Sequence, residues 1–558
     1  MANKGKFFRW LVVVVSCGFS AVWPGCGDDG ESVGPGSVSV VPELLVVPGA
    51  VPEPNPVAGV ETPPELNFAR ALVYQARGSK NEQIEQVVLC MPGFLGGAND
   101  FDYLARRMIA RTEGRTAVWA VDRRSNALED HVGLDRAERE RNPDVAKAYY
   151  FQGAEIDGQR FRGFLRPEQL RFMSEWGLKV HIEDLRALVR EAWRRYPRAA
   201  IFLAGHSLGA SIVPIFAAWD FGRYSGFELL SGLILLEGAP NAGANPPSQQ
   251  AYETSGIGGG FSRVSLQTLR AGSPISSLEP FVSMDLFVTA EILGMRASPE
   301  FGQAESLSPD ADLYRSFFSL LFGSTEIPPA TNQAALGFGF DNDFQPLAFA
   351  RISIGSAAGG RIGPNPNAGL LGQLLGAVGN LLAPLDPTAT YVWQDAAADD
   401  PERLDPVRLD TFANLLFRGP SNFIEWYFPA RLTLDVAVTT GLNVARSNDW
   451  RLDRYGLAAT ENARVDVPVF AVGGSRALLS NLERLRPYRD SLASRLRNGE
   501  LRDGVADGFR TMLMDRYVHL DVLAADDERG SGNGLFATMV DWMASAKRLA
   551  PRRPDLTP

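Results

Sequence analysis

Two parts of the chain alternate short apolar runs with segments whose apolar residues recur at helical spacing. The runs, each of which predicts a buried strand, lie at residues 68–74, 86–91, 117–121, 201–204, 232–236, 467–472 and 509–514. The helical pattern lies at residues 101–111, 182–195, 208–220, 478–497 and 534–548. Strands that are apolar throughout and alternate with helices form a parallel sheet covered on both faces. The pattern therefore predicts an α/β fold built on a mostly parallel sheet.

This alternation stops after the run at 232–236. From there to residue 461 glycine and proline are frequent, and the helical pattern returns only in short stretches, at residues 312–322, 370–382 and 412–417. We expect a large, mainly helical cap at residues 241–461. It would be inserted between two parts of one core, residues 66–240 and 462–548, and a tail would follow at 549–558.

Two apolar groups inside the predicted cap allow two interpretations each. Leucines and valine between residues 370 and 382 lie at helical spacing, with no charge between Arg361 and Asp386. A lid that meets lipid has this composition, but so does a helix packed into a core, and the interspersed glycines favour close packing. The second group consists of the aromatic residues Phe423, Trp426, Tyr427 and Phe428. It predicts either core or an acyl pocket, and core is the commoner outcome.

A serine between two glycines joins the run at 201–204 to the helical pattern at 208–220. The sequence there is Gly205-His206-Ser207-Leu208-Gly209, a G-x-S-x-G motif with a strand before it and a helix after it. A sharp strand-to-helix turn exposes the serine hydroxyl, and the following helix N-terminus favours negative charge beside it. An idle serine in a tight turn is the alternative. The context favours Ser207 as a nucleophile.

Through this motif the sequence resembles the α/β-hydrolase superfamily, in particular its lipase and esterase branch. The resemblance covers about residues 66–240 and 465–548 and makes the run at 232–236 the sixth strand of that fold. It implies an oxyanion hole with one backbone donor after the strand at 86–91 and one after the serine, here Phe94 and Leu208. Relatives often carry His-Gly where this chain has Pro92-Gly93, which leaves the backbone donor in place. A plain loop with Asn99 as a helix cap is the alternative for Phe94.

Four histidines limit the choice of a general base: His131, His181, His206 and His519. The superfamily order is serine, acid, histidine. His131 and His181 precede the serine, and His206 is its neighbour in the turn. His519, between the last predicted strand and the last predicted helix, is therefore the expected base, which takes the proton of Ser207 and later protonates the leaving alcohol.

The acid that orients the base is harder to assign. Relatives usually place it after the strand represented here by residues 467–472, but that loop contains no carboxylate. Some lipases take the acid from the end of the sixth strand, where this chain has Glu237. Glu237 is our prediction. Glu483, Asp449, Asp453 and the absence of an acid stay open, whereas Asp521 is so close to His519 in sequence that it fits a loop cap better.

The N-terminus has the plan of an export signal. Lysines and an arginine precede an apolar run at residues 10–23, and Cys26 follows a small residue. This resembles a bacterial lipoprotein signal, residues 1–26, in which Cys26 is lipidated, although Trp23 departs from the usual aliphatic residue. Simple secretion and a retained anchor are the alternatives. Residues 27–65, rich in glycine, proline and valine, are expected to form a flexible linker.

Composition narrows the function classes. The net charge of −10 and the absence of a basic stripe argue against nucleic acid as a partner. The sequence has no H-E-x-x-H metal motif, no cysteine or histidine cluster and no phosphate-binding Walker motif, so we expect neither a metal nor a cofactor.

We therefore expect an exported serine hydrolase of the bacterial cell envelope, membrane-anchored by lipid or secreted, that cleaves lipid or other apolar acyl esters. Peptidases, thioesterases and acyltransferases use the same triad. The alternative is a non-catalytic hydrolase-fold lipoprotein that binds a ligand or partner. The missing acid after the seventh strand favours that alternative, and the joint presence of serine, histidine and oxyanion loop opposes it.

Overall fold

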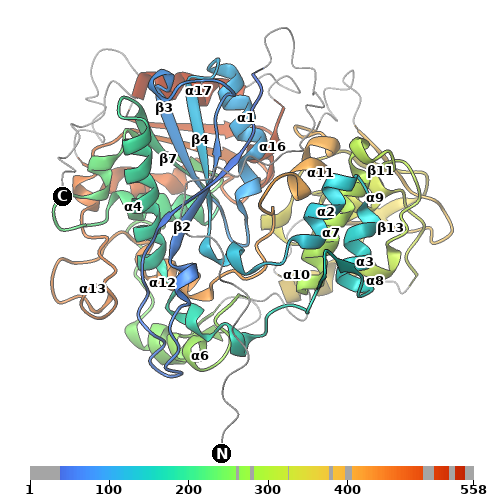
Figure 1. Ribbon diagram of the computed structural model, residues 1–558, viewed down its shortest axis with the longest axis horizontal. Helices are drawn as coiled ribbons and strands as arrows, with labels where there is room; N and C mark the ends of the chain where they lie inside the picture. Colours follow the sequence, from blue (N-terminus) through green and yellow to red (C-terminus); the bar gives the residue numbers. More distant parts are fainter. Residues whose placement is uncertain are drawn as a thin grey trace, which may run out of the picture.

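The computed structural model describes residues 38–258, 263–276, 282–323, 326–375, 381–395, 405–493, 508–526 and 534–546. An eight-stranded sheet runs through its core (Figure 1). The strands lie in the order β1 (Glu43–Pro48), β2 (Phe68–Tyr74), β4 (Thr116–Asp122), β3 (Gln86–Met91), β7 (Ala200–His206), β8 (Gly232–Leu236), β15 (Val469–Gly474) and β16 (Phe509–Met514). β2 runs antiparallel to both of its neighbours, β1 and β4, and the other neighbouring strands of this sheet pair in parallel.

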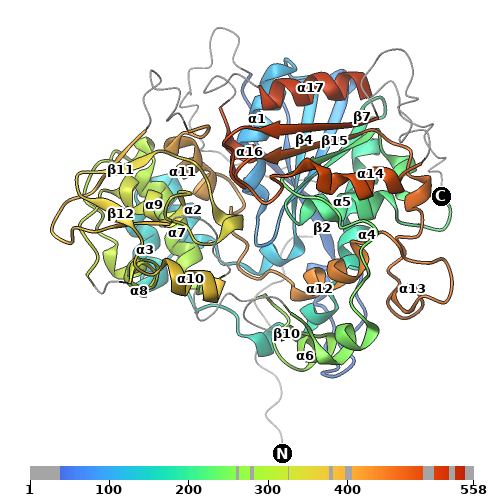
Figure 2. The ribbon, with the colours of Figure 1, turned by 180° about the vertical axis from the view of Figure 1, so that it is seen from behind.

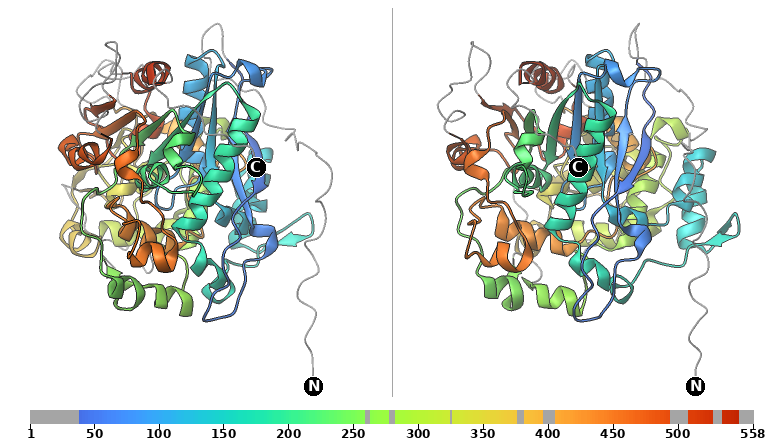
Figure 3. Two further views of the ribbon diagram at one scale, coloured as in Figure 1. Left: turned by 90° about the vertical axis from the view of Figure 1, so that its left-hand side faces the viewer. Right: turned by 60° about the vertical axis from the view of Figure 1, so that its left-hand side comes forward.

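Alternate side chains of these strands enter two separate hydrophobic clusters. Val118, Phe202 and Ile234 face a cluster that contains α1 (Asp102–Arg111) and α17 (Leu535–Ala546). The neighbouring residues of each strand face a cluster that contains α4 (Leu178–Arg195) and α5 (Gly209–Ala217). Figure 3 shows α4, in green, running alongside the strands. The strand order and the helices on both faces are those of an α/β hydrolase, which confirms the predicted fold class.

The prediction of a flexible linker at residues 27–65 is wrong from residue 43 onward. β1 pairs with β2 along its whole length, from Glu43 opposite Val73 to Pro48 opposite Phe68. Asn55 is fully buried and donates to the carbonyls of Arg171 and Arg270. β1 escaped prediction because it is an edge strand with only alternate residues half-buried, so its apolar run is short and ends in proline.

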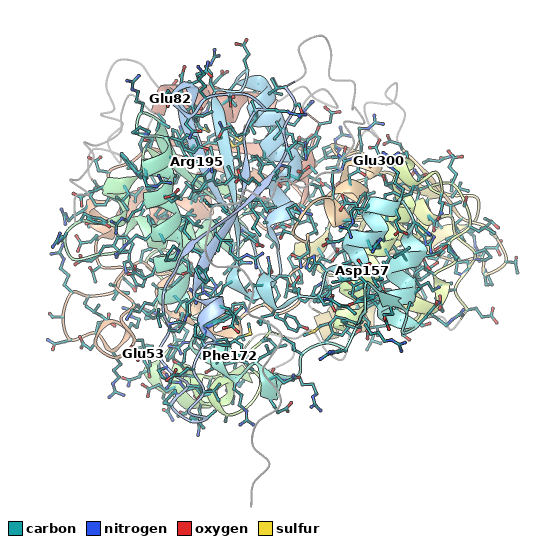
Figure 4. All side chains as sticks on the ribbon, in the orientation of Figure 1. Glu53, Glu82, Asp157, Phe172, Arg195 and Glu300 are labelled. Atoms are coloured by element: carbon teal, nitrogen blue, oxygen red, sulfur yellow. The ribbon has the colours of Figure 1, made fainter. Side chains whose placement is uncertain are left out.

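A second lobe lies beside the core (Figures 1 and 2). It contains α7 (Met284–Ala297), α8 (Ala311–Phe322), α9 (Asn332–Phe340), α10 (Ala368–Leu375), α11 (Leu409–Phe417) and short hairpins, among them β11 (Ser356–Ala358) with β14 (Val392–Gln394). Two helices from before the serine join this cap lobe, α2 (Val132–Glu140) and α3 (Pro143–Phe151), which contact α7. Figure 4 labels Asp157 and Glu300, whose side chains lie on this lobe.

Part of the predicted insertion lies outside the cap lobe. After α11 the chain returns to the core, where α12 (Ala430–Thr439) packs against α4 and α5. α6 (Leu266–Ala271) contacts α12, and α13 (Trp450–Tyr455) follows it. The cap lobe is therefore built from two separate stretches of chain. Its position next to the carboxyl ends of β3, β7 and β16 places it over the predicted site residues.

Two predicted helices differ from the structure within the described residues. The helix predicted at 370–382 is helical in α10, and Leu382 belongs instead to β13 (Leu382–Pro384), which pairs with β12 (Ile362–Pro364). In α10, Leu371 is buried and Leu370 is exposed, so one side of this helix packs against the lobe and another side faces solvent. The charged stretch at 478–497 is described as far as residue 493, and that part forms a 3₁₀ turn at Leu482–Leu485 and α14 (Arg486–Ser491). Within the described ranges we find no helix that is both long and apolar enough to cross a bilayer.

Candidate active site

Ser207 occupies a strained turn between β7 and α5. Its φ is 54°, in the left-handed region that residues other than glycine rarely adopt. The turn is tight because Gly209 lies against the preceding loop: a Cβ at Gly209 would meet the carbonyl oxygen of Met91 at 2.1 Å. A Cβ at Gly205 would meet Gly209 O at 2.2 Å. Both glycines of the motif are therefore required by the backbone, and the turn is fixed where β7 meets the end of β3.

The structure brings Glu237 and His519 together. His519 Nδ1 lies 3.2 Å from Glu237 Oε2, and both side chains are about 1% exposed. Glu237 follows β8 with a φ of 49°, so the turn aims its carboxylate sideways across the sheet. The carboxylate also accepts hydrogen bonds from the backbone N–H of Gly474 at 2.5 Å and of Leu479 at 3.3 Å. The loop after β15 that lacks an acid therefore supplies donors for the acid of the adjacent strand.

His519 precedes α16 (Asp521–Ala524) and is held by its own loop. Its carbonyl oxygen lies 3.1 Å from His206 Nε2, and the two imidazole rings are 4.7 Å apart. Asp521 accepts from Val518 N–H and from Ser353 N–H, both at 2.8 Å, as expected of a loop cap. Burial lowers the pKa of the His519 imidazole and raises that of the Glu237 carboxyl. The apolar surroundings therefore favour a neutral imidazole.

The two predicted oxyanion donors lie on backbone segments that touch each other. A Cβ at Gly93 would lie 2.9 Å from Ser207 Cβ, so the loop before Phe94 packs directly on the serine. Phe94 lines the same cavity as Ser207, and Leu208 is the residue before α5. Asn99, the alternative helix cap, instead donates its side-chain amide to the carbonyls of Arg418 and Ser421.

A cavity of about 130 Å³ joins the predicted site to the cap lobe. Ser207 and His519 line it at the core end. The rest of its wall is mostly apolar and includes Phe287, Ala290 and Leu293 of α7, Phe317 and Phe318 of α8, Phe340 of α9, Phe349 and Phe423. Of the aromatic group 423–428, Phe423 lines the cavity, whereas Trp426, Tyr427 and Phe428 are buried in the core. Such a wall suits a hydrocarbon chain.

The other candidate residues lie elsewhere. Asp449 caps α13 and pairs with Arg451 at 2.6 Å, while Asp453 and Glu483 are exposed. His181 is buried in α4 with Nδ1 2.8 Å from Gly177 O, and His131 stacks on Trp426. In the part of the chain that the structure describes, no group of histidine, cysteine and acidic residues could hold a metal ion. Cys26 lies outside the described residues.

Sequence reasoning missed one buried pair next to the oxyanion loop. Arg123, after β4, donates to Glu425 at 2.7 Å and to three loop carbonyls. Its carboxylate partner is a single glutamate 302 positions away in the sequence. An acidic residue inside an otherwise apolar and aromatic stretch was the available signal, because buried carboxylates need partners.

Comparison with known proteins shows remote structural likeness only. No family model and no curated protein matches the sequence. A Sulfolobus solfataricus protein suggested to be a lipase matches with 13% identity over 90% of this chain and 94% of that chain, at a TM-score of 0.42. The peroxisomal alpha-beta-hydrolase of Saccharomyces cerevisiae matches with 10% identity over 93% of each chain, at a TM-score of 0.35. A carboxyl esterase from Bacillus coagulans matches with 12% identity over 86% and 94%, at 0.31. Function has to be argued from the site itself.

Proposed function

We propose that the protein is a serine hydrolase that cleaves carboxylic esters with an apolar acyl group. The observation that carries the proposal is the buried contact between Glu237 and His519, beside a strained Ser207, at the core end of an apolar cavity. In this proposal Ser207 is the nucleophile, His519 the general base and Glu237 the acid that fixes the imidazole tautomer. No metal or cofactor is needed for this chemistry.

The reaction proceeds in two halves. Ser207 Oγ attacks the ester carbonyl while His519 Nε2 accepts the hydroxyl proton, and the backbone N–H groups of Phe94 and Leu208 bind the oxyanion. The tetrahedral intermediate collapses as His519 protonates the leaving alcohol, which leaves an acyl-enzyme. Water, deprotonated by His519, then releases the acid and restores the serine. The cavity wall holds the acyl chain, so apolar esters are the expected substrates.

The test measures hydrolysis of p-nitrophenyl butyrate and p-nitrophenyl laurate by the full chain and by variants. Ser207→Ala should lower kcat on the order of 10⁴-fold or more, and Glu237→Gln about 10⁴-fold, as loss of triad members does elsewhere. Ser211→Ala is the matched control, because Ser211 lies one helical turn further on and its hydroxyl bonds Ala239 O instead of facing the cavity. A fluorophosphonate probe should label Ser207.

The competing proposal is a binding protein of the same fold without turnover. It would be supported if the unaltered chain hydrolysed neither ester and resisted the fluorophosphonate. A kcat of Glu237→Gln within tenfold of the unaltered chain would contradict the assignment of the acid.

We also propose export and lipid anchoring at Cys26, which the signal-like N-terminus supports. The mature protein would sit in the bacterial cell envelope. Mass spectrometry of the envelope fraction should find an acylated Cys26 at the new N-terminus, and Cys26→Ser should release the protein from the membrane. An unmodified cysteine in a soluble product would favour simple secretion.

A further inference from the structure

The loop that carries Phe94 is held by the guanidinium of Arg123. Its Nη2 donates to Pro92 O at 2.6 Å and to Gly93 O at 2.8 Å, and its Nη1 donates to Gly96 O at 2.8 Å. The side chain of Arg123 is 1% exposed, so these bonds do not compete with water. The planar fork of arginine suits several fixed acceptors at once.

One of these bonds determines where the N–H of Phe94 points. Gly93 C=O and Phe94 N–H belong to the same peptide unit, which is planar and trans, so they point in opposite directions. Because Gly93 O faces Arg123, Phe94 N–H faces away from Arg123. Phe94 and Ser207 line the same cavity, and the neighbouring Gly93 packs on Ser207. The arginine therefore orients the peptide that carries the proposed oxyanion donor.

Arg123 is in turn held by Glu425. Arg123 Nη1 donates to Glu425 Oε2 at 2.7 Å, and Ser125 Oγ donates to Glu425 Oε1. The Glu425 side chain is fully buried, and the charge of Arg123 opposes the rise in its pKa that burial causes. A single buried carboxylate thus fixes the guanidinium that three carbonyls share.

Glu425 belongs to the segment that returns from the cap lobe to the core. This return segment, residues 421–425, follows α11 on the lobe and precedes α12 on the core (Figure 1). Its backbone pairs with the oxyanion loop: Glu425 N–H donates to Leu95 O, and Gly97 N–H donates to Phe423 O, both at 2.8 Å. A Cβ at Gly97 would lie 2.0 Å from Asn422 O, so the two segments are in close contact.

We propose that Glu425 is a positioning residue for catalysis, which acts through Arg123 to orient the Gly93–Phe94 peptide. The oxyanion site is then complete only when the return segment of the cap lobe is docked on the loop. This inference rests on the proposed function, because it concerns the oxyanion donor of the same reaction. Preorganised donors are effective because they need no reorientation as charge develops.

The chain offers a matched control in the next residue. Arg124 is as buried as Arg123, but it pairs with Asp184 at 2.6 Å and donates to Ala50 O, away from the oxyanion loop. Asp184→Asn and Glu425→Gln therefore each remove one charge from a buried arginine pair. Only the second pair holds the Phe94 peptide.

The experiment measures kcat and KM of the full chain on p-nitrophenyl butyrate, with rates divided by active sites titrated with a fluorophosphonate. Glu425→Gln should lower kcat per active site on the order of 10-fold to 100-fold, and Arg123→Lys on the order of 10²-fold to 10³-fold, the range seen when an oxyanion donor is lost. KM should stay within about twofold, since ground-state binding is untouched. Asp184→Asn should keep the kcat of the unaltered chain.

A second readout separates positioning from folding. A trifluoromethyl ketone adds the Ser207 oxygen to its carbonyl carbon, the hydroxyl proton passes to His519, and the adduct carries an oxyanion. Its Ki should rise in Glu425→Gln by the same factor by which kcat/KM falls. If Glu425→Gln does not fold, Ser125→Ala, which removes one donor to Glu425, should still lower kcat per site by about threefold to tenfold, in proportion to one lost hydrogen bond.

An unchanged kcat per site in Glu425→Gln, or an equal fall in Asp184→Asn, would overturn the inference while leaving the esterase intact. An unchanged kcat in a folded Ser125→Ala would overturn it as well when Glu425→Gln cannot be made. Absence of turnover and of labelling in the unaltered chain would instead overturn the proposed function, and the inference with it.

Discussion

At the scale of single residues, the site depends on positions where the backbone leaves no room for a side chain. Ser207 and Glu237 both have positive φ angles. Each is followed within two residues by a glycine, Gly209 or Gly238, against which the backbone of another segment packs closely. A Cβ at Gly238 would lie 2.3 Å from Ser207 O, so the turn that carries the acid packs on the turn that carries the serine. The packing of the neighbouring turns therefore holds Ser207 in its strained backbone conformation.

Gly209→Ala should separate the serine turn from the oxyanion loop. The new methyl group would meet Met91 O at 2.1 Å, and neither partner is a flexible side chain. We expect a loss of stability of about 1–3 kcal/mol, as for other overpacked sites, together with a fall in kcat of at least tenfold. Thermal unfolding and ester hydrolysis measure the two effects.

The matched control for that change is Gly369→Ala on the exposed side of α10, where a Cβ would meet no atom within 4 Å. It should leave kcat unchanged and stabilise the helix slightly. Full activity in Gly209→Ala would show that the turn tolerates a shift, contrary to this view of the site.

At the scale of elements, the strands and helices that could be predicted were those in which burial produces a regular spacing of apolar residues. β2, β3, β8 and β16 have the bounds that the apolar runs predicted. β3 and β8 are interior strands buried along their whole length, so their sequences are almost entirely apolar. β16 is an edge strand in which mainly the two end residues, Phe509 and Met514, are buried. β1 was missed because its apolar run is short and ends in proline. In the cap lobe α7 and α9 were missed, and both contain glycine, which weakens the helical pattern. Glu237 could be proposed from the sequence because few positions fit the order of a triad, and the structure places it in contact with His519. Glu425 depends on a contact that no local pattern encodes.

The helix α7 should control the length of acyl chain that the cavity accepts. Ala290 lines the cavity next to Phe287 and Leu293. Ala290→Leu would fill part of the cavity volume. We expect kcat/KM for p-nitrophenyl laurate to fall at least tenfold, because each lost methylene contact costs about 0.8 kcal/mol. The kcat/KM for the short ester p-nitrophenyl acetate should change by less than about threefold. Ala297→Leu, buried in the same helix away from the cavity, is the control. A parallel fall for both esters would place the acyl chain elsewhere.

β1 should be part of the stable fold rather than a tether. It forms a six-residue antiparallel pair with β2, and Leu45 and Val47 pack on the core beneath α4. A chain that starts at residue 49 should therefore unfold at a lower Tm than one that starts at residue 38, by about 2–4 °C for each kcal/mol lost. Equal Tm values for the two truncated chains would show that β1 does not contribute to stability, as expected of a linker.

At the scale of the whole molecule, the cap lobe and the core share the loops of the site. Leu520 N–H, next to His519, donates to Arg351 O at 3.0 Å, and Ser353 N–H donates to Asp521. The return segment holds the oxyanion loop in the same way. One segment of the cap lobe thus contacts the loop of His519, and the return segment contacts the loop of Phe94. The lobe is therefore part of the proposed site as well as its cover.

A half-buried pair of His131 and Glu129 at the junction of the two lobes should make stability depend on pH. His131, before α2, lies 2.9 Å from Glu129, which also accepts from Trp426 N–H of the chain that returns from the cap lobe. Burial lowers the pKa of His131, but the hydrogen bond and charge of Glu129 outweigh it, helped by Glu291 of α7 and Asp135, and raise that pKa to about 9. Burial also raises the pKa of Glu129 to about 7.

Both shifts mean that the folded protein binds protons more tightly than the unfolded chain. The stabilisation from His131 is therefore complete below its unfolded pKa of about 6.5 and is lost as the pH rises through about 9. We expect Tm to fall between pH 6.5 and 9, and His131→Gln to flatten that part of the curve. His181→Gln is the control, because burial lowers the pKa of His181 to about 3 and keeps it neutral throughout this range. If His131→Gln kept the slope of the unaltered chain, the proton would be bound elsewhere and the junction would not couple the lobes to pH.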